Sequence, residues 1–510
     1  MKRLPGTTAA LWLSFASLAS LAGCADVDAD ATAASAATSH ALEATDPDPS
    51  GGQLRLVHAS AASGAFDVYA GTSSTPLWTG VSFGSATAYA ALPAGDVQLV
   101  FRSAGASADA APLYTSEIIA VHGGDVVTTV AGGLLGTSVA SARFRVQAFA
   151  ESFAAANPGT RRVRFVQESH ALASTSFDLG ADGSSEIVGL GSFGGSDAAG
   201  VELRATARPL QLVVSTGTPA RKLTAFTLPP ELLAADDSLF LVLVGVPTFL
   251  PRDTRGLALL AVGHGHATLV RQNPTVYVLP AIPDAAGIDL YAFGRGIGAG
   301  RVAENAPMGA LVAPLQVPPS ASGYGFLITE ADANPGDGLS GQPLGLASTG
   351  PLLAGERYLA VASGFAHGDA AVRPHVTLSV TRDGFATQIG KGRVRALAAA
   401  ADAPSVDVGQ FAPGENTAFT VLAGAAGLTY GATSAEPGVE VDAVPLNPGV
   451  RPSGASDAWR FRFGALSSVE RAFAVVAGAF APLPGDVGVR VIVVKTIASG
   501  NWTAQVLSPQ

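Results

Sequence analysis

One aspartate, set between apolar residues, recurs four times along the sequence. Asp67 in GAFDVYAG is followed, at spacings of 111, 111 and 118 residues, by Asp178, Asp289 and Asp407. In a strand the apolar neighbours point to one face, so the carboxylate points to the other. No second acidic residue accompanies it at a fixed spacing, and a single carboxylate cannot make a calcium cage. The pattern therefore predicts a structural marker in each copy, with a ligand or metal role as the alternative.

Three of these aspartates follow an arginine that lies twelve to fourteen residues earlier in an apolar run: Arg55, Arg164 and Arg395. A hairpin centred near Ala61 would bring Arg55 opposite Asp67, where the two side chains would form a cross-strand ion pair. The carboxylate could instead accept backbone N–H groups. In the third copy the arginine is missing and Tyr277 stands in its place.

Three other patterns could do chemistry but lack the context that the chemistry needs. GLGSFG, residues 189–194, fits a phosphate-binding pattern without the surrounding βαβ unit, so we expect a turn at a strand end. His264 and His266 lie two apart on a predicted strand without a third ligand, which predicts a surface pair. EADANPGDG, with Asp332, Asn334 and Asp337, departs from the spacing of a calcium loop. We therefore predict no metal and no cofactor.

Enzyme chemistry finds little support in the sequence. The eight histidines do not follow the repeat. Catalysis needs a nucleophile with a base, or paired carboxylates in a cleft. We therefore predict a structural or binding module without catalysis. The alternative is a secreted hydrolase or a carbohydrate-active protein on a β scaffold.

The segments around each aspartate show that the chain consists of four diverged copies of one unit. The runs LRLVHAS, VRFVQES, TVYVLPA and VRALAAA precede the markers, and an apolar run that ends in glycine follows each of them. Short apolar runs between Gly, Pro, Asn and Asp clusters predict an all-β fold. We expect four tandem antiparallel β-sandwiches of the immunoglobulin-like kind, which bury their own cores and are joined by short linkers. Their predicted bounds are residues 53–159, 160–272, 273–390 and 391–510.

The composition limits the partners. The net charge is −10 and no run of Lys or Arg is present, so nucleic acid is excluded as a partner because it needs a concentrated basic face. The chain has one cysteine, Cys24, so no intramolecular disulfide or thiolate zinc site can form.

The setting of Cys24 resembles a bacterial lipobox. Lys2 and Arg3 precede an apolar segment that closes with Leu21, Ala22, Gly23 and Cys24, which is the order of a secretory signal. The resemblance implies a signal peptide over residues 1–23 and a lipid anchor on Cys24. The alternative is a signal peptide with an incidental cysteine. Residues 24–52, rich in Ala, Asp, Ser and Thr, are predicted to be a flexible tether.

The predicted anchor implies a membrane partner and a place in the cell envelope. Ala25 after the cysteine resembles the signal for export to the outer membrane or cell surface of a Gram-negative bacterium. An envelope protein or a glycan is the expected binding partner.

The succession of arginine-containing strand, small-residue turn and aspartate strand resembles the bacterial secreted family DUF 4397, a domain of unknown function. The resemblance covers residues 53–510 and is clearest in LRLVHASAASGAFDVYAG and HGGDVVTTVAGG of the first copy. It implies an extracytoplasmic β domain, often in tandem, and no known activity.

Overall fold

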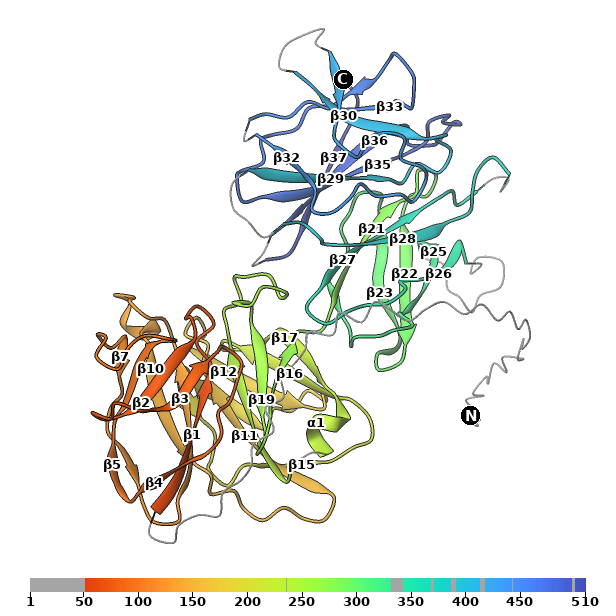
Figure 1. Cartoon of the computed structure of the whole chain (residues 1–510). Coiled ribbons are helices and arrows are strands. Elements are labelled where there is room, and N and C mark those ends of the chain that lie inside the picture. Colours follow the sequence, from red (N-terminus) through yellow and green to blue (C-terminus); the bar gives the residue numbers. More distant parts are fainter. Residues whose placement is uncertain are drawn as a thin grey trace, which may run out of the picture. The chain divides into compact units, whose positions relative to one another are not determined.

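In the computed structural model (Figure 1), nearly all regular secondary structure is β-strand. It describes residues 51–234, 236–331, 343–367, 371–386, 391–412, 418–442, 444–497 and 500–510. Within these ranges the helices are α1 (Pro230–Ala234) and a 3-10 turn at Ala140–Ala142. No helix of the described chain is both long and apolar enough to cross a membrane.

The first repeat contains two four-stranded sheets. Its first sheet, which holds the first strand, has the order β10 (Arg145–Ala150), β9 (Val126–Gly132), β1 (Gly51–His58) and β4 (Ala90–Pro93). Its second sheet, which holds the aspartate strand, has the order β3 (Pro76–Val81), β2 (Phe66–Ala70), β6 (Leu99–Ser103) and β7 (Tyr114–Thr115). A separate pair is formed by β5 (Gly95–Val97) and β8 (Ile119–Val121).

The second repeat follows the same plan. In its first sheet, β14 and β15 both pair with β11, and the sheet contains β14 (Gly194–Gly195), β15 (Val201–Arg204), β11 (Thr160–Gln167), β18 (Ser238–Val244), β19 (Ala258–Val262) and β20 (Ala267–Arg271). Its second sheet has the order β13 (Ile187–Gly191), β12 (Ser174–Leu179), β16 (Leu210–Thr216) and β17 (Arg221–Leu228).

The third and fourth repeats keep this order. The first sheet of the third repeat contains β24 (Leu315–Gln316), β21 (Thr275–Ala281), β27 (Arg357–Ser363) and β28 (Thr377–Arg382). Its second sheet contains β23 (Gly298–Ala306), β22 (Ile288–Gly294), β25 (Gly325–Glu330) and β26 (Gly345–Ser348).

In the fourth repeat the first sheet contains β32 (Val439–Val441), β29 (Gly392–Ala398), β35 (Arg471–Ala477), β36 (Arg490–Thr496) and β37 (Thr503–Leu507). The second contains β31 (Phe419–Val421), β30 (Val406–Phe411), β33 (Pro448–Pro452) and β34 (Trp459–Arg460).

The predicted all-β sandwich class is confirmed, with one strand pair that differs from a purely antiparallel sheet. In every repeat the first strand pairs in parallel with the strand that ends beside the recurring glycine: β1 with β9, β11 with β18, β21 with β27 and β29 with β35. Parallel neighbours need a long crossover connection. The chain supplies it by building the whole second sheet between the two strands.

Each sandwich buries an apolar core between its two sheets. In the first repeat the core joins Leu54 and Leu56 of β1 to Phe66 of β2 and Phe101 of β6, all almost completely buried. Corresponding cores fill the second, third and fourth repeats. Burial of this kind of surface stabilises a sandwich by about 25 cal/mol per Å² of apolar area.

The outer faces of the first sheets are also buried, because the repeats pack in pairs. Val57 and Val130 of the first repeat share one apolar cluster with Val166, Phe240 and other residues of the second. A matching cluster joins the third and fourth repeats through residues that include Leu279, Val361, Phe473 and Val475. Beyond the predicted short linkers, the repeats of these two pairs are therefore also joined by an apolar interface, which the sequence analysis did not predict. Their first sheets have two apolar faces, and both are covered.

Candidate functional site

The four marker aspartates lie at equivalent places in the fold, on the second strand of each repeat. They are buried: the exposed fraction is 7% for Asp67, 7% for Asp178, 0% for Asp289 and 4% for Asp407. The Asp67 carboxylate accepts the backbone N–H groups of Gly80 and Gly105, each at 2.8 Å. Because Gly80 lies in β3 and Gly105 in the turn after β6, the carboxylate ties both of these segments to strand β2.

The other three carboxylates are used in the same way. Asp178 accepts the N–H groups of Asp182 and Gly183, and Asp289 accepts the N–H of Asn305 at 2.7 Å. Asp407 accepts the Gly427 N–H at 2.9 Å, the Ser453 hydroxyl at 2.6 Å and the Arg451 Nε at 3.0 Å. Together with the Arg451 ion pair, these hydrogen bonds lower the pKa of Asp407 in spite of its burial, which acts in the opposite direction.

The expected ion pair between Arg55 and Asp67 is wrong. β1 and β2 belong to different sheets, so the small-residue turn near Ala61 is an arch from one sheet to the other and not a hairpin. The same change of sheet separates Arg164 from Asp178 and Arg395 from Asp407.

The arginines instead join the two repeats of each pair. The guanidinium of Arg55 donates to the carbonyl of Gly263, which directly follows β19 of the second repeat. It also donates to the Thr128 hydroxyl at 2.7 Å, pairs with Glu151 at 3.1 Å and lies 4.7 Å from the ring centre of Tyr89. Burial of Tyr89 raises its pKa above the ordinary value of a phenol.

An equivalent contact runs in the opposite direction in the same pair. Arg164 of the second repeat donates to the carbonyl of Ala150, the last residue of β10, at 2.8 Å. β10 and β19 hold equivalent positions, since each pairs antiparallel with the strand that ends beside the recurring glycine. The two repeats therefore exchange guanidinium–carbonyl bonds around an approximate two-fold axis, as two copies do in an isologous interface.

The second pair makes the same exchange with one substitution. Arg395 donates to the carbonyl of Arg382, the last residue of β28, at 2.6 Å. Tyr277 stands at the arginine position and stacks on Trp502, with 4.2 Å between ring centroids. The return bond comes from Arg357, at the start of β27, which donates to the carbonyl of Ile497 at 2.5 Å. The missing arginine of the third repeat is thus replaced from the neighbouring strand.

The remaining sequence motifs are placed as follows. The GLGSFG segment covers the end of β13, a turn at Ser192 and Phe193 and the start of β14, as predicted for a turn at a strand end. His264 and His266 lie in the turn between β19 and β20 and not on a strand, and His266 lies 3.4 Å from the Asp236 carboxylate. In the described part of the chain, no group of three or more His, Cys, Asp or Glu side chains could hold a metal ion. The lipobox residues and the EADANPGDG residues Asp332, Asn334 and Asp337 lie outside the described residues.

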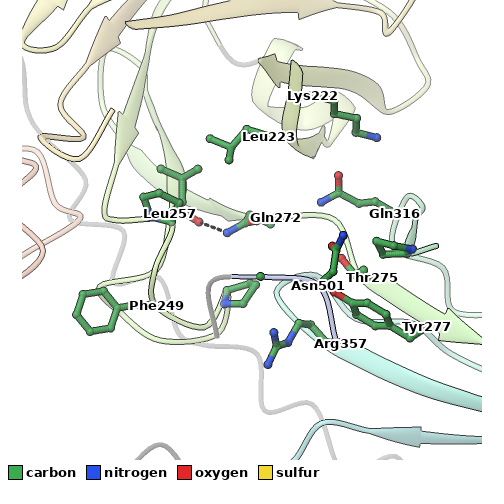
Figure 2. Close-up of a pocket in the computed structure, with 14 residues that line it drawn as sticks. Lys222, Leu223, Phe249, Leu257, Gln272, Thr275, Tyr277, Gln316, Arg357 and Asn501 are labelled. Carbon is green, nitrogen blue, oxygen red and sulfur yellow. Dashed lines mark hydrogen bonds between the residues drawn. The ribbon is translucent and has the colours of Figure 1, made fainter. Parts of the chain in front are cut away.

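The sequence did not point to a pocket that the second, third and fourth repeats line together (Figure 2). It has a volume of about 360 Å³. Its polar wall residues include Lys222, Gln272, Gln316, Arg357 and Asn501, and its apolar wall residues include Leu223, Leu257 and Phe249. None of these positions follows the repeat pattern, so self-similarity along the sequence gave no signal for them.

Most of the polar groups around this pocket are already engaged. The Gln272 side-chain amide donates to the carbonyl of Leu257 at 2.9 Å (Figure 2), and Gln316 donates to the Thr224 hydroxyl. Arg357 is neutralised by Asp383, whose carboxylate lies 2.5 Å from its guanidinium. Asn501 is exposed and offers both a donor and an acceptor at the wall. The pocket can therefore hydrogen-bond a polar molecule, and Lys222 adds a positive charge to its wall.

Comparison with known proteins supports the resemblance over part of the chain. No curated protein is significantly similar to the sequence. Residues 52–191, which comprise the first repeat and the start of the second, match the family DUF4397, described as a domain of unknown function.

Proposed function

We propose that the chain is a lipoprotein of the bacterial cell envelope, anchored through Cys24, in which the four repeats act as a structural and binding module without catalysis. The LAGC segment supports the anchor, and two or more acyl chains on one residue give stable membrane attachment. The Ala/Asp/Ser/Thr-rich residues that follow would hold the repeats away from the bilayer. Ala25 favours the outer membrane of a Gram-negative bacterium.

The packing of the repeats in pairs supports a structural role. Buried arginines and aspartates of the repeats form hydrogen bonds with the backbone of neighbouring loops and strands, so these side chains hold the loops and strands in place. Two apolar interfaces add rigidity, because packed interiors resist deformation. Rigid pairs of repeats suit a protein that presents a surface to a partner.

The observation that carries the binding role is the pocket of Figure 2. Its wall combines amide and hydroxyl groups with apolar side chains. In ligand pockets of this kind, a few polar groups fix the orientation of the bound molecule and so provide specificity. A pocket of about 360 Å³ fits one or two sugar rings and is too small to hold a protein surface. Of the two partner classes, a glycan is therefore the better match.

Titration with short oligosaccharides from the producing cell's envelope tests this role. Ligand-observed NMR on the purified full-length chain should detect binding that Asn501→Ala weakens. The exposed amide of Gln505 on β37 lies outside the pocket wall, so Gln505→Ala is the matched control. Equal binding by both variants, or none by wild type, would refute the glycan site. New reducing ends during incubation would favour a hydrolase.

A further inference from the structure

A second cavity, of about 230 Å³, lies between the first and second repeats. The first repeat contributes Ala59, Ala61, Ala62, Gly133 and Leu134, and the second repeat contributes Glu168, His170, Gly245, Val246, Phe249 and Arg255. Most of these residues are apolar or lack a side chain. The carboxyl group of Glu168 is therefore the exceptional feature of the wall.

Glu168 is buried without a partner. Its exposed fraction is 2%, and neither carboxyl oxygen has a hydrogen-bond partner in the described chain. Gly132 at the end of β9 makes room for this group, since a Cβ there would come within 1.9 Å of the Glu168 Oε2. Buried polar groups are nearly always hydrogen-bonded, so this carboxyl requires an explanation.

The other repeats show that the fold does not need an acid here. Glu168 directly follows the first strand of its repeat, and the equivalent residues of the other repeats are Ala59, Ala281 and Ala399. Gly132 is likewise exceptional, because the residues that end the equivalent strands are Val244, Ser363 and Ala477. The carboxyl and the space beside it therefore occur together, at one of four equivalent places.

The charges around the cavity leave the carboxyl uncompensated. Arg255 lies over the Phe249 ring at 4.1 Å and is neutralised by Asp253, 3.1 Å away. Burial lowers the pKa of His170, which keeps its ring neutral near pH 7. Arg145 attracts the carboxylate from a distance, but its guanidinium donates to the carbonyls of Ala140 and Arg143. The group missing from this site is a hydrogen-bond donor with a positive charge.

We propose that this cavity binds a small organic amine, with its ammonium group on the Glu168 carboxylate and its hydrocarbon part against the alanines, Leu134 and Val246. Burial raises the pKa of Glu168 well above that of an ordinary carboxyl group, and an ammonium ligand that stabilises the carboxylate therefore favours release of the carboxyl proton into solvent. This cavity shares the Phe249 ring with the wall of the glycan pocket, but Glu168 does not line that pocket, and the site does not depend on the anchor.

Calorimetric titration of the full-length chain with n-butylammonium chloride tests the site. Wild type should bind the amine and release protons, which is measured by repeating the titration in buffers of different ionisation enthalpy. Glu168→Gln should weaken binding by about tenfold or more, because a neutral amide cannot replace a charge-assisted hydrogen bond. Glu231→Gln, at an exposed glutamate of the same repeat, should leave the affinity unchanged.

Two neutral or anionic probes and one peptide probe complete the experiment. 1-Butanol and butyrate should bind much more weakly than butylammonium. Ala61→Leu, which enlarges a side chain of the cavity wall, should also reduce amine binding. Nα-acetyl-lysine methylamide distinguishes a lysine side chain from a free amine as the source of the ammonium group. The proposal is overturned if no amine binds, if butanol binds as tightly, or if Glu168→Gln retains the wild-type affinity.

Discussion

The apolar interface between the first and second repeats should make them unfold as one unit, and Phe240→Ala tests this. Phe240 on β18 is completely buried in that interface, and its ring centroid lies 5.3 Å from that of Phe153 and 6.4 Å from that of Phe149. Loss of a buried phenylalanine ring costs about 3–5 kcal/mol. For a cooperative unit the size of residues 51–272, each kcal/mol lowers Tm by about 2–4 °C. We therefore expect a decrease of about 6–20 °C in the melting of the first pair.

Hydrogen exchange during thermal or denaturant unfolding of the full-length chain is the assay, because it reports each repeat separately. Peptides from β2 and β6 of the first repeat should lose protection together with peptides from β18, although the substitution lies in the second repeat. Phe326→Ala, at a completely buried ring in the core of the third repeat, is the control. It should lower the melting temperature of only the second pair. Wild-type protection of β2 and β6 in Phe240→Ala would refute cooperative unfolding of the pair.

Three further predictions concern single side chains. Asp67→Ala should lower the free energy of unfolding by about 2–4 kcal/mol, since two N–H groups lose a charged acceptor. Its effect should add to that of Arg55→Ala within about 0.5 kcal/mol, and urea denaturation of the double mutant would reveal any coupling. Burial raises the pKa of Glu168, so between the ordinary and the raised pKa the folded chain binds a proton that the unfolded chain has released. The contribution of this group to stability is therefore fully present below the ordinary carboxyl pKa and is lost as the pH rises through the raised pKa. Glu168→Gln should therefore raise Tm near pH 8 and flatten its pH dependence. Cys24→Ser should abolish acylation and detergent-dependent extraction, and mass spectrometry of an unmodified wild-type N-terminus would contradict the anchor.

The repeat organisation could be predicted because it leaves a signal along the sequence. The aspartates recur with nearly constant spacing, and each one marks the second strand of a sandwich. The partner of Arg55 could not be predicted in this way. A short turn of small residues fits a hairpin within one sheet as well as an arch between two sheets, and only the pairing of the remaining strands decides between them.

The paired interfaces did leave a signal, but of a different kind. β18 reads SLFLVLV and is buried at six of its seven residues, and β27 and β35 are buried throughout. A strand with one covered face alternates apolar and polar residues, whereas a continuous apolar strand indicates that both faces are covered. The polar pocket of Figure 2 left no such signal, because residues far apart in the sequence meet there only after the repeats have packed.

The approximate two-fold symmetry of the first pair explains why the amine site should occur once in each chain. A symmetric interface presents every contact twice, so the counterpart of the Glu168 and Gly132 contact involves Ala59 and Val244, which both belong to the apolar cluster. One half of the interface is thus packed with hydrocarbon, while the other half holds the carboxyl. In the second pair, Ala281, Ala399 and Ala477 are likewise buried in, or directly beside, an apolar interface. Calorimetry should therefore give one butylammonium per chain, and a stoichiometry of two or four would mean that binding follows the repeat and not Glu168.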